Sequence, residues 1–324
     1  MRLVLMLLSL LPFSLLAKPA PLPDLLELKA WSVPWGGRPR DPAVAPDGSL
    51  WFCGQAGNYI GRLEPGSGDL KRFPLPKGTH PHNLIVAPDG AVWYAGNRSA
   101  SIGRLDPKSG AIDSHPMPRG LVDPHTLIWD GAGHIWFSAQ WSNALGHLNT
   151  ASGQVQVFKV PLPRARPYGI KLGKDGNPWA VLLGSNHLAT VRDGRLSLVE
   201  IPRKEARPRR LEITQDGALW YVDYAGGVLG RHDPGDGSFR EWPMPGGRGS
   251  HPYGTALDDS GRVWIAETGV TPNRLVAFDT KTLRFVSRSK VPGGGSVRHM
   301  FFDPRGKAFW FGVDTGYVVR ARPR

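Results

Sequence analysis

The chain has 324 residues, a formal net charge of +13 and a single cysteine, Cys53. One cysteine excludes an intrachain disulfide and a cysteine-based zinc site, so the fold must depend on a hydrophobic core. The 12 tryptophans and 12 phenylalanines provide apolar surface for that core. The basic charge favours anionic partners, but Arg, Pro and Gly are abundant along the whole chain, so charge alone does not identify a partner.

The first residues predict export. Arg2 is followed by a mostly apolar run over residues 3–16, and Ala17 supplies a small residue for cleavage. The run is too short to span a membrane and is typical of a secretory signal. We therefore expect a signal peptide over residues 1–17, a mature domain over residues 18–324, and a periplasmic or secreted location. An uncleaved anchor is the alternative.

A motif recurs along the rest of the chain, in which a turn glycine is followed three or four residues later by tryptophan. These tryptophans are Trp51, Trp93, Trp136, Trp179, Trp220, Trp264 and Trp310, with spacings of 42, 43, 43, 41, 44 and 46 residues. Such a period is the length of one β-propeller blade. Seven repeats predict an all-β fold, a seven-bladed β-propeller.

Each unit contains the same four phrases. An opening strand is introduced by x-Pro-x, as at residues 80–82, and an Asp-Gly hairpin turn follows, as at 89–90. The tryptophan strand comes next, as at 93–94, then a third strand, as at 102–105. The fourth strand ends in proline, as at 73–76, which suits an outer edge that need not donate hydrogen bonds. Four short strands per unit predict four-stranded antiparallel blades.

The last unit lacks a proline-ended fourth strand, because the chain ends at Arg324 soon after the third. The missing pattern occurs at the other terminus, over residues 25–34, before the first unit. We therefore expect this N-terminal segment to supply the outer strand of the seventh blade. That arrangement closes the ring and leaves no long unpaired edge.

The opening strands should line the central channel, where residues two apart share a face. Eleven residues before each tryptophan stand Arg40, His82, His125, Tyr168, Arg209, Tyr253 and His299; thirteen before stand Arg38, His80, Asp123, Arg166, Arg207, His251 and Val297. Five of these fourteen positions are His, although the chain has only ten. One channel mouth is thus expected to be a basic, titratable site. A solvated rim that fills the channel is the alternative.

Carboxylates follow the tryptophan strands of three adjacent units, at Asp223, Glu267 and Asp314. Beside His251 and His299 they are candidates for binding a divalent ion or for proton transfer. Salt bridges to the surrounding arginines are the competing interpretation, and spacing does not separate the two.

The phrases at residues 81–84, 89–94 and 102–105 resemble the virginiamycin B lyase (streptogramin lyase) family, and the similarity extends over residues 25–322. The resemblance implies a seven-bladed propeller and an enzyme that opens a cyclic depsipeptide by elimination. In that family a histidine removes the proton α to a carbonyl, and a magnesium ion held by two glutamates stabilises the negative charge that develops.

The family's catalytic phrase Glu-Pro-His reads Val-Arg-His here, so the resemblance implies His299 as the base while Val297 replaces the first metal glutamate. Asp314 stands in the place of the second. Because valine cannot bind a metal, magnesium affinity is expected to be poor unless Glu267 of the neighbouring unit substitutes for it. Asp314 and Glu267 are therefore the metal-ligand candidates.

The remaining candidates are expected to contact the substrate. By resemblance Tyr253 takes the place of a substrate-contacting histidine, and His251 lies two residues earlier on the same face. The other candidates at this mouth are His82, His125, Arg40 and Arg209.

Two functions follow from these features. One is an exported lyase that opens an ester, a lactone or a cyclic depsipeptide by proton abstraction at the channel mouth. The other is a non-catalytic propeller that binds an anionic ligand or protein partner through the same residues. A calcium-dependent lactonase fits less well, because its site needs converging oxygen ligands. We expect a monomer with no membrane span after signal cleavage and no nucleic-acid partner.

Overall fold

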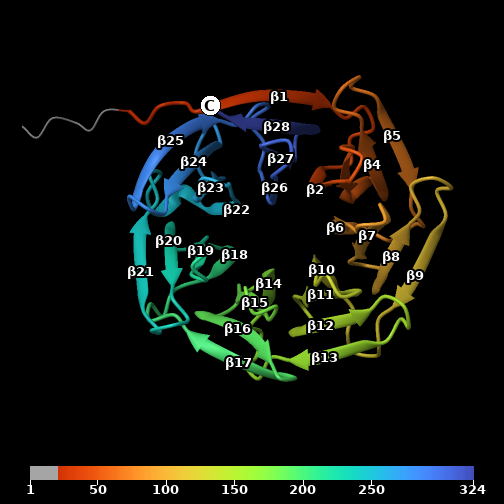
Figure 1. Ribbon diagram of the computed structural model, residues 1–324, viewed down its shortest axis with the longest axis horizontal. Helices are drawn as coiled ribbons and strands as arrows, with labels where there is room; N and C mark the ends of the chain where they lie inside the picture. The colour runs from red at the N-terminus through yellow and green to blue at the C-terminus, as the bar shows by residue number, and fades with distance from the viewer. Residues whose placement is uncertain (1–20) are drawn as a thin grey trace, which may run out of the picture.

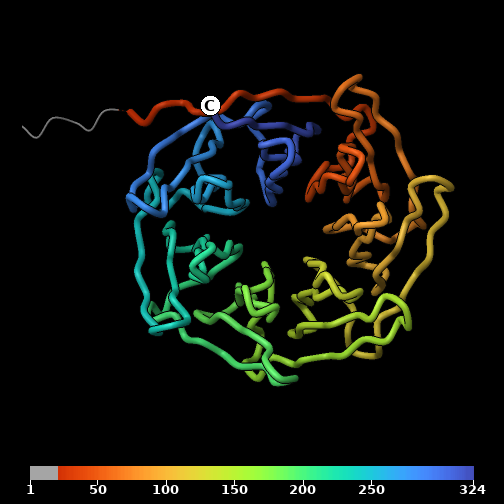
Figure 2. Tube along the Cα trace, in the orientation of Figure 1, coloured from red at the N-terminus to blue at the C-terminus, as the bar shows by residue number. Residues whose placement is uncertain are grey.

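The computed structural model describes residues 21–324, so the predicted signal peptide lies outside the described residues. Seven four-stranded antiparallel sheets form a ring around a central axis (Figures 1 and 2). Within each sheet the strands follow chain order from the axis outward, except in the seventh. The predicted fold class, blade number and strand number per blade are confirmed.

The strand bounds reproduce the repeat period. Blade one holds β2 (Pro39–Val44), β3 (Leu50–Gly54), β4 (Tyr59–Leu63) and β5 (Leu70–Pro74); blade two holds β6 (Pro81–Val86), β7 (Val92–Gly96), β8 (Ser101–Leu105) and β9 (Ile112–Pro116). Blade three holds β10 (Pro124–Trp129), β11 (His134–Ala139), β12 (Ala144–Asn149) and β13 (Val155–Lys159); blade four holds β14 (Pro167–Leu172), β15 (Pro178–Leu182), β16 (His187–Arg192) and β17 (Arg195–Glu200). Blade five holds β18 (Pro208–Ile213), β19 (Leu219–Asp223), β20 (Val228–His232) and β21 (Phe239–Pro243); blade six holds β22 (Pro252–Leu257), β23 (Arg262–Glu267), β24 (Arg274–Asp279) and β25 (Arg284–Lys290). Short 3-10 turns cover Gln55–Gly57 and Arg248–Ser250.

The two ends of the chain complete blade seven together. Its inner strands are β26 (Met300–Asp303), β27 (Ala308–Val313) and β28 (Tyr317–Pro323), and β1 (Leu26–Ser32) is the outer strand. β1 pairs antiparallel with β28 along its whole length, from Leu26 opposite Pro323 to Ser32 opposite Tyr317. Figure 1 shows the red and blue ends side by side. The predicted closure by the N-terminal segment is confirmed.

A bulge in the innermost strands determines which residues face the channel. Six of these strands begin with the proline of x-Pro-x, a position where a strand does not need an N–H donor. In each of the six, the pairing with the next strand slips soon after that proline. A slip of one residue exchanges the two faces of a strand. Residues on both sides of the bulge can therefore point to the axis, even where an odd number of positions separates them.

The core lies between neighbouring blades. Trp51, Trp220 and Trp264 are almost completely buried there. In blades one, two, three and five an aromatic ring packs on a glycine of the third strand, and a Cβ at Gly61 would lie 2.2 Å from the ring of Phe52. Glycine thus allows the aromatic ring of one strand to lie flat over its neighbour. This dense packing fixes the inner strands and so the channel side chains.

Over residues 21–324 we find no helix that is long and apolar enough to cross a membrane.

Candidate functional site

The predicted channel residues lie in two layers at the x-Pro-x end. In the outer layer Arg38 is exposed, and His80, Arg166, Arg207 and His251 are half-buried. Asp123 is buried and accepts hydrogen bonds from the backbone N–H groups of Trp141 and Ser142, so it orders a loop. The outer layer is basic, as predicted from the sequence.

The inner layer at this end is a closed plug of aromatic side chains. The rings of His82 and His125 lie 3.7 Å apart, and His125 lies 4.1 Å from Tyr168. The hydroxyl groups of Tyr168 and Tyr253, from blades four and six, form a hydrogen bond. The guanidinium of Arg209 lies 4.5 Å from the centre of the Tyr253 ring, a cation–π contact. The structure therefore brings these predicted substrate contacts together, where they contact one another.

The plug is electrostatically unusual because it collects buried groups near several arginines. Burial lowers the pKa of His82 and of His125 well below the usual value, and the charges of Arg40 and Arg210 lower both further. Both imidazoles are neutral at pH 7. For Tyr253 burial alone would raise the pKa, but Arg209, Arg40 and Arg210 outweigh it and the pKa is lowered.

A buried ionic network lies directly behind the plug. Asp41 is fully buried; its carboxylate is 2.9 Å from Arg40 Nε and 3.4 Å from a terminal nitrogen of Arg210. Asn83 also donates to it, at 3.1 Å. Burial on its own would raise the pKa of Asp41, but the two guanidinium charges hold it well below the usual range. Arg210 also donates to Thr126 Oγ1 at 3.1 Å. The network joins blades one, two, three and five.

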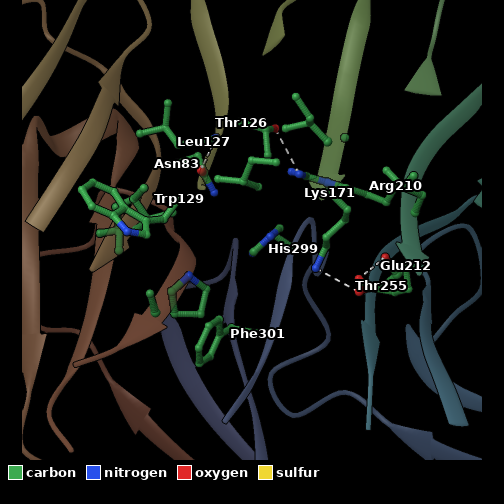
Figure 3. A pocket seen from close by; sticks show the side chains of 18 of the residues that line it. Asn83, Thr126, Leu127, Trp129, Lys171, Arg210, Glu212, Thr255, His299 and Phe301 are labelled. Atoms are coloured by element: carbon green, nitrogen blue, oxygen red, sulfur yellow. Dashed lines mark hydrogen bonds and ion pairs between the residues drawn. The ribbon is translucent and has the colours of Figure 1, made fainter. Parts of the chain in front are cut away.

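Beyond this network the channel opens into a cavity of about 260 Å³ (Figure 3). Its apolar wall includes Leu84, Leu127, Trp129, Ile170 and Phe301, and its polar side chains are Asn83, Thr126, Lys171, Arg210, Glu212, Thr255 and His299. Lys171 Nζ lies 2.9 Å from Glu212 Oε2, and Thr255 donates to Glu212 Oε1 at 3.1 Å. The cavity is thus an apolar pocket with a few converging polar groups, the usual character of a small-molecule site.

His299 is the predicted catalytic residue that lines this cavity, and Figure 3 shows its imidazole among the other lining side chains. Its Nδ1 is buried and has no hydrogen-bond partner among the described residues. Burial lowers the pKa of His299 to about 3, and the positive charge of Arg210 contributes. Its imidazole is therefore neutral at pH 7 and can accept a proton. Arg210 is 3% exposed, and its Nε is likewise unpartnered in the part of the chain that is described.

The two predicted metal ligands are each held in an ion pair. Asp314 receives hydrogen bonds from Arg298 at 2.7 and 3.0 Å. Glu267 is fully buried, pairs with Arg274 and accepts the backbone N–H of Gly246 at 2.6 Å. Neither carboxylate is free to bind a cation. Val297, which stands where the family phrase has its first metal-binding glutamate, has no ligand atom. These residues do not fit a magnesium site of the kind that the resemblance implies.

Asp223 completes the same pattern, because it pairs with Arg203 and accepts the backbone N–H groups of Ala225 and Gly226. The three carboxylates that follow the tryptophan strands thus each bind a different arginine and order their own blade. These contacts agree with the interpretation that the three carboxylates form salt bridges with nearby arginines.

Three polar residues of the cavity, Arg210, Lys171 and Glu212, were not predicted from the sequence. Strict alternation from the x-Pro-x residues points these three side chains away from the axis or leaves them unassigned, whereas the bulge turns them inward. The signal that could have found them is the proline that opens each inner strand, since proline in a strand marks an irregularity.

Comparisons with known proteins agree with this architecture. A family model described as the virginiamycin B lyase family matches residues 27–320. No curated protein sequence matches the chain significantly.

Among solved structures, virginiamycin B lyase from Staphylococcus aureus superposes with a TM-score of 0.84 at 22% identity, over 92% of this chain and 100% of that one. A streptogramin B lyase gives a TM-score of 0.83 at 23% identity, over 92% and 98% of the two chains. The WD40 propeller domain of Doa1 gives 0.77 at 10% identity, over 92% and 97%. At these identities the structural likeness shows the fold.

Proposed function

Because the chain belongs to the virginiamycin B lyase family, we propose that it is a lyase-type enzyme that opens a small anionic ester or lactone in the axial cavity, without magnesium. His299 would be the base and Arg210 would bind the anionic group, with the Lys171–Glu212 ion pair beside it. The single observation that carries the proposal is the unpartnered Nδ1 of His299 in the cavity that Arg210, whose Nε is also unpartnered, lines as well.

The charges of the cavity support an anionic ligand. Arg210 is buried with an unpartnered Nε, and a buried donor without a partner costs about 1–3 kcal/mol. An oxyanion against that guanidinium would satisfy the donor. Its own partner Asp41 already shares its charge with Arg40, so one positive charge in this network is uncompensated.

The chemistry requires a base that gains strength when substrate binds. In the free protein burial lowers the pKa of His299 to about 3, and repulsion from Arg210, Lys171 and Arg40 contributes. An anion placed against Arg210 would offset part of that repulsion and raise the pKa toward the range that suits a general base. The proton α to a carbonyl would move to His299, its electron pair would form the new double bond, and the carboxylate of the β-acyloxy group would leave without needing a proton.

The size of the cavity restricts the substrate. A volume of about 260 Å³ is below the range for drug-sized ligands, about 300–1,000 Å³. The apolar wall with Trp129 and Phe301 suits a short hydrocarbon or aromatic body. We therefore propose a substrate smaller than a macrocyclic depsipeptide.

A turnover assay tests the proposal. A panel of carboxylate-bearing lactones and β-acyloxy esters would be incubated with the protein in excess EDTA, and the unsaturated product followed by ultraviolet absorbance. We expect His299→Gln to abolish turnover and His251→Gln, at the opposite mouth, to retain it. Turnover that requires magnesium, or that survives in His299→Gln, would contradict the proposal.

Non-catalytic binding of an anionic ligand is the second candidate, because Val297 and the Arg298–Asp314 pair depart from the family's catalytic phrase. It predicts that small carboxylates such as benzoate bind in a salt-sensitive manner while no member of the ester panel is converted. Retention of binding in His299→Gln together with absent turnover in the unmodified protein would favour this candidate.

A further inference from the structure

Three potential metal ligands meet at the turn end of blade three, away from the axial cavity. Asp130 begins the turn between β10 and β11, His134 begins β11, and His147 lies on β12. Their ligand atoms all lie within 4.8 Å of one another. Asp130 Oδ2 is 3.4 Å from His134 Nδ1 and 3.3 Å from His147 Nε2. In a tetrahedral zinc site with bonds of about 2.0 Å, neighbouring ligand atoms are about 3.3 Å apart.

The other blades show what usually occupies this place. Arg62, Arg104 and Arg231 each stand opposite the blade tryptophan and donate to an aspartate of the turn, at 3.0, 3.3 and 3.3 Å. In blade three His147 stands opposite Trp136 and stacks on it at 4.0 Å. An imidazole thus stands at the arginine position, and it pairs with Asp130, which lies six residues before Trp136, whereas the aspartates of the other three blades lie four residues before their tryptophans.

His134 shows the same replacement from a second position. In blade six Asp258 pairs with Arg262, four residues later, at 2.7 Å. His134 is likewise four residues after Asp130. Both arginine positions that neutralise a turn aspartate elsewhere are therefore histidine in blade three. The fold does not demand histidine at these two positions, since other blades carry arginine at each of them.

The carboxylate is also oriented for a third partner. Asp130 Oδ1 accepts the backbone N–H groups of Ala132 at 2.7 Å and His134 at 3.0 Å. These bonds fix the group and direct Oδ2 toward the two imidazoles, the kind of support that orients metal ligands. A surface hollow of about 270 Å³ adjoins the imidazoles and is lined by Asn149, Gln154 and Gln156, which leaves room for water as a fourth ligand.

We propose that Asp130 Oδ2, His134 Nδ1 and His147 Nε2 bind a Zn²⁺ ion whose remaining position is open to water. This donor set of two imidazoles and one carboxylate is of the type that zinc accepts. The site is independent of the axial cavity and of the proposed lyase activity.

Asn149 sets the strength of the site. Its amide nitrogen lies 3.2 Å from His134 Nε2, while its oxygen accepts the backbone N–H groups of Ala151 and Ser152. Binding of zinc at Nδ1 places a proton on Nε2, which then faces another donor, so the Asn149 side chain must move. At the equivalent position blades two and five carry Asp106 and Asp233, and a carboxylate there would accept that proton.

Calorimetry with ZnCl₂ at pH 7.5 tests the proposal on the unmodified protein and two variants. We expect one Zn²⁺ per chain in the unmodified protein and about 100-fold weaker binding in His147→Arg, which restores the residue of the sister blades. Asn149→Asp should bind about tenfold more tightly, because its carboxylate supports the His134 ring.

Thermal unfolding provides the matched control. The His147→Arg variant should keep the melting temperature of the metal-free protein, and zinc should raise the melting temperature only where the site is intact. No binding to the unmodified protein, or equal binding to the unmodified protein and His147→Arg, would overturn the proposal.

Discussion

The two halves of the axial channel use similar residues in different ways. At the x-Pro-x end, His82, His125, Tyr168 and Tyr253 contact one another and close the channel. At the opposite end, His299 faces a cavity. Among the described residues the Nδ1 atoms of His82 and His299 both lack a hydrogen-bond partner, so the open volume is the difference between them. Histidine and arginine at an axis therefore do not by themselves mark a site. What distinguishes a candidate site is polar groups that face an open volume.

The plug half is expected to stabilise the fold. The largest loss of stability should come from breaking the ionic network of Asp41, Arg40 and Arg210. Asp41→Asn leaves the guanidinium groups of Arg40 and Arg210 buried without their carboxylate. Breaking such a pair by removing one partner costs about 3–5 kcal/mol. Urea unfolding followed by tryptophan fluorescence measures the loss.

Asp47→Asn is the matched control, because Asp47 pairs with Arg62 on the surface. Exposed pairs contribute about 0–1 kcal/mol, so this variant should unfold close to the unmodified protein. If both variants lose the same stability, the network behind the plug is not the support that we describe.

A second effect follows from the neutral imidazoles of the channel. The folded-state pKa values of His82, His125 and His299 are all lowered, whereas the unfolded chain takes up these protons near pH 6.5. Stability is therefore expected to fall as the pH drops below about 6.5, by about 1.4 kcal/mol per pH unit for each histidine. Urea midpoints at pH 7 and pH 5 measure this slope, and His125→Gln should reduce it. Equal stability at the two pH values would contradict the account.

The sequence was sufficient to predict the blades because their signals are local. The Trp51 to Trp310 spacing gives the number of blades, and the proline-ended pattern over residues 25–34 gives the closure. Each depends on residues a few positions apart, which is the scale at which turns and strands are encoded. The ring itself then follows from the need to pair every edge.

The site was predicted only in part because side-chain direction depends on the bulges. The assumption that alternate residues of an inner strand face the axis placed His299 there, and the structure agrees. The same assumption overlooked Arg210, which the bulge of blade five turns toward the cavity. Asp314 and Glu267 were assigned by type, while their arginine partners could be assigned only from the folded geometry. Pairing between distant residues was the missing information.

A third test restores the family phrase beside the channel. The double variant Val297→Glu and Arg298→Pro supplies a carboxylate and releases Asp314 from its guanidinium partner. We expect its Mg²⁺ affinity to exceed that of the unmodified protein by at least about tenfold, as measured by calorimetry. Val297→Glu alone, which retains Arg298, should gain much less. Equal affinity in the unmodified protein and the double variant, with an unchanged melting temperature, would show that the ion pair does not replace a metal.

The most direct test of the cavity is a proton NMR titration of the His299 imidazole, assigned by the resonance that is lost in His299→Gln. The account predicts that this ring stays unprotonated at every pH above about 4.5, in keeping with a pKa of about 3. Saturation with benzoate, or the Arg210→Met change, should raise that pKa because either one weakens the positive charge around the ring. An ordinary pKa near 6.5 that neither benzoate nor Arg210→Met alters would contradict the claim that His299 and Arg210 form one anion-responsive site.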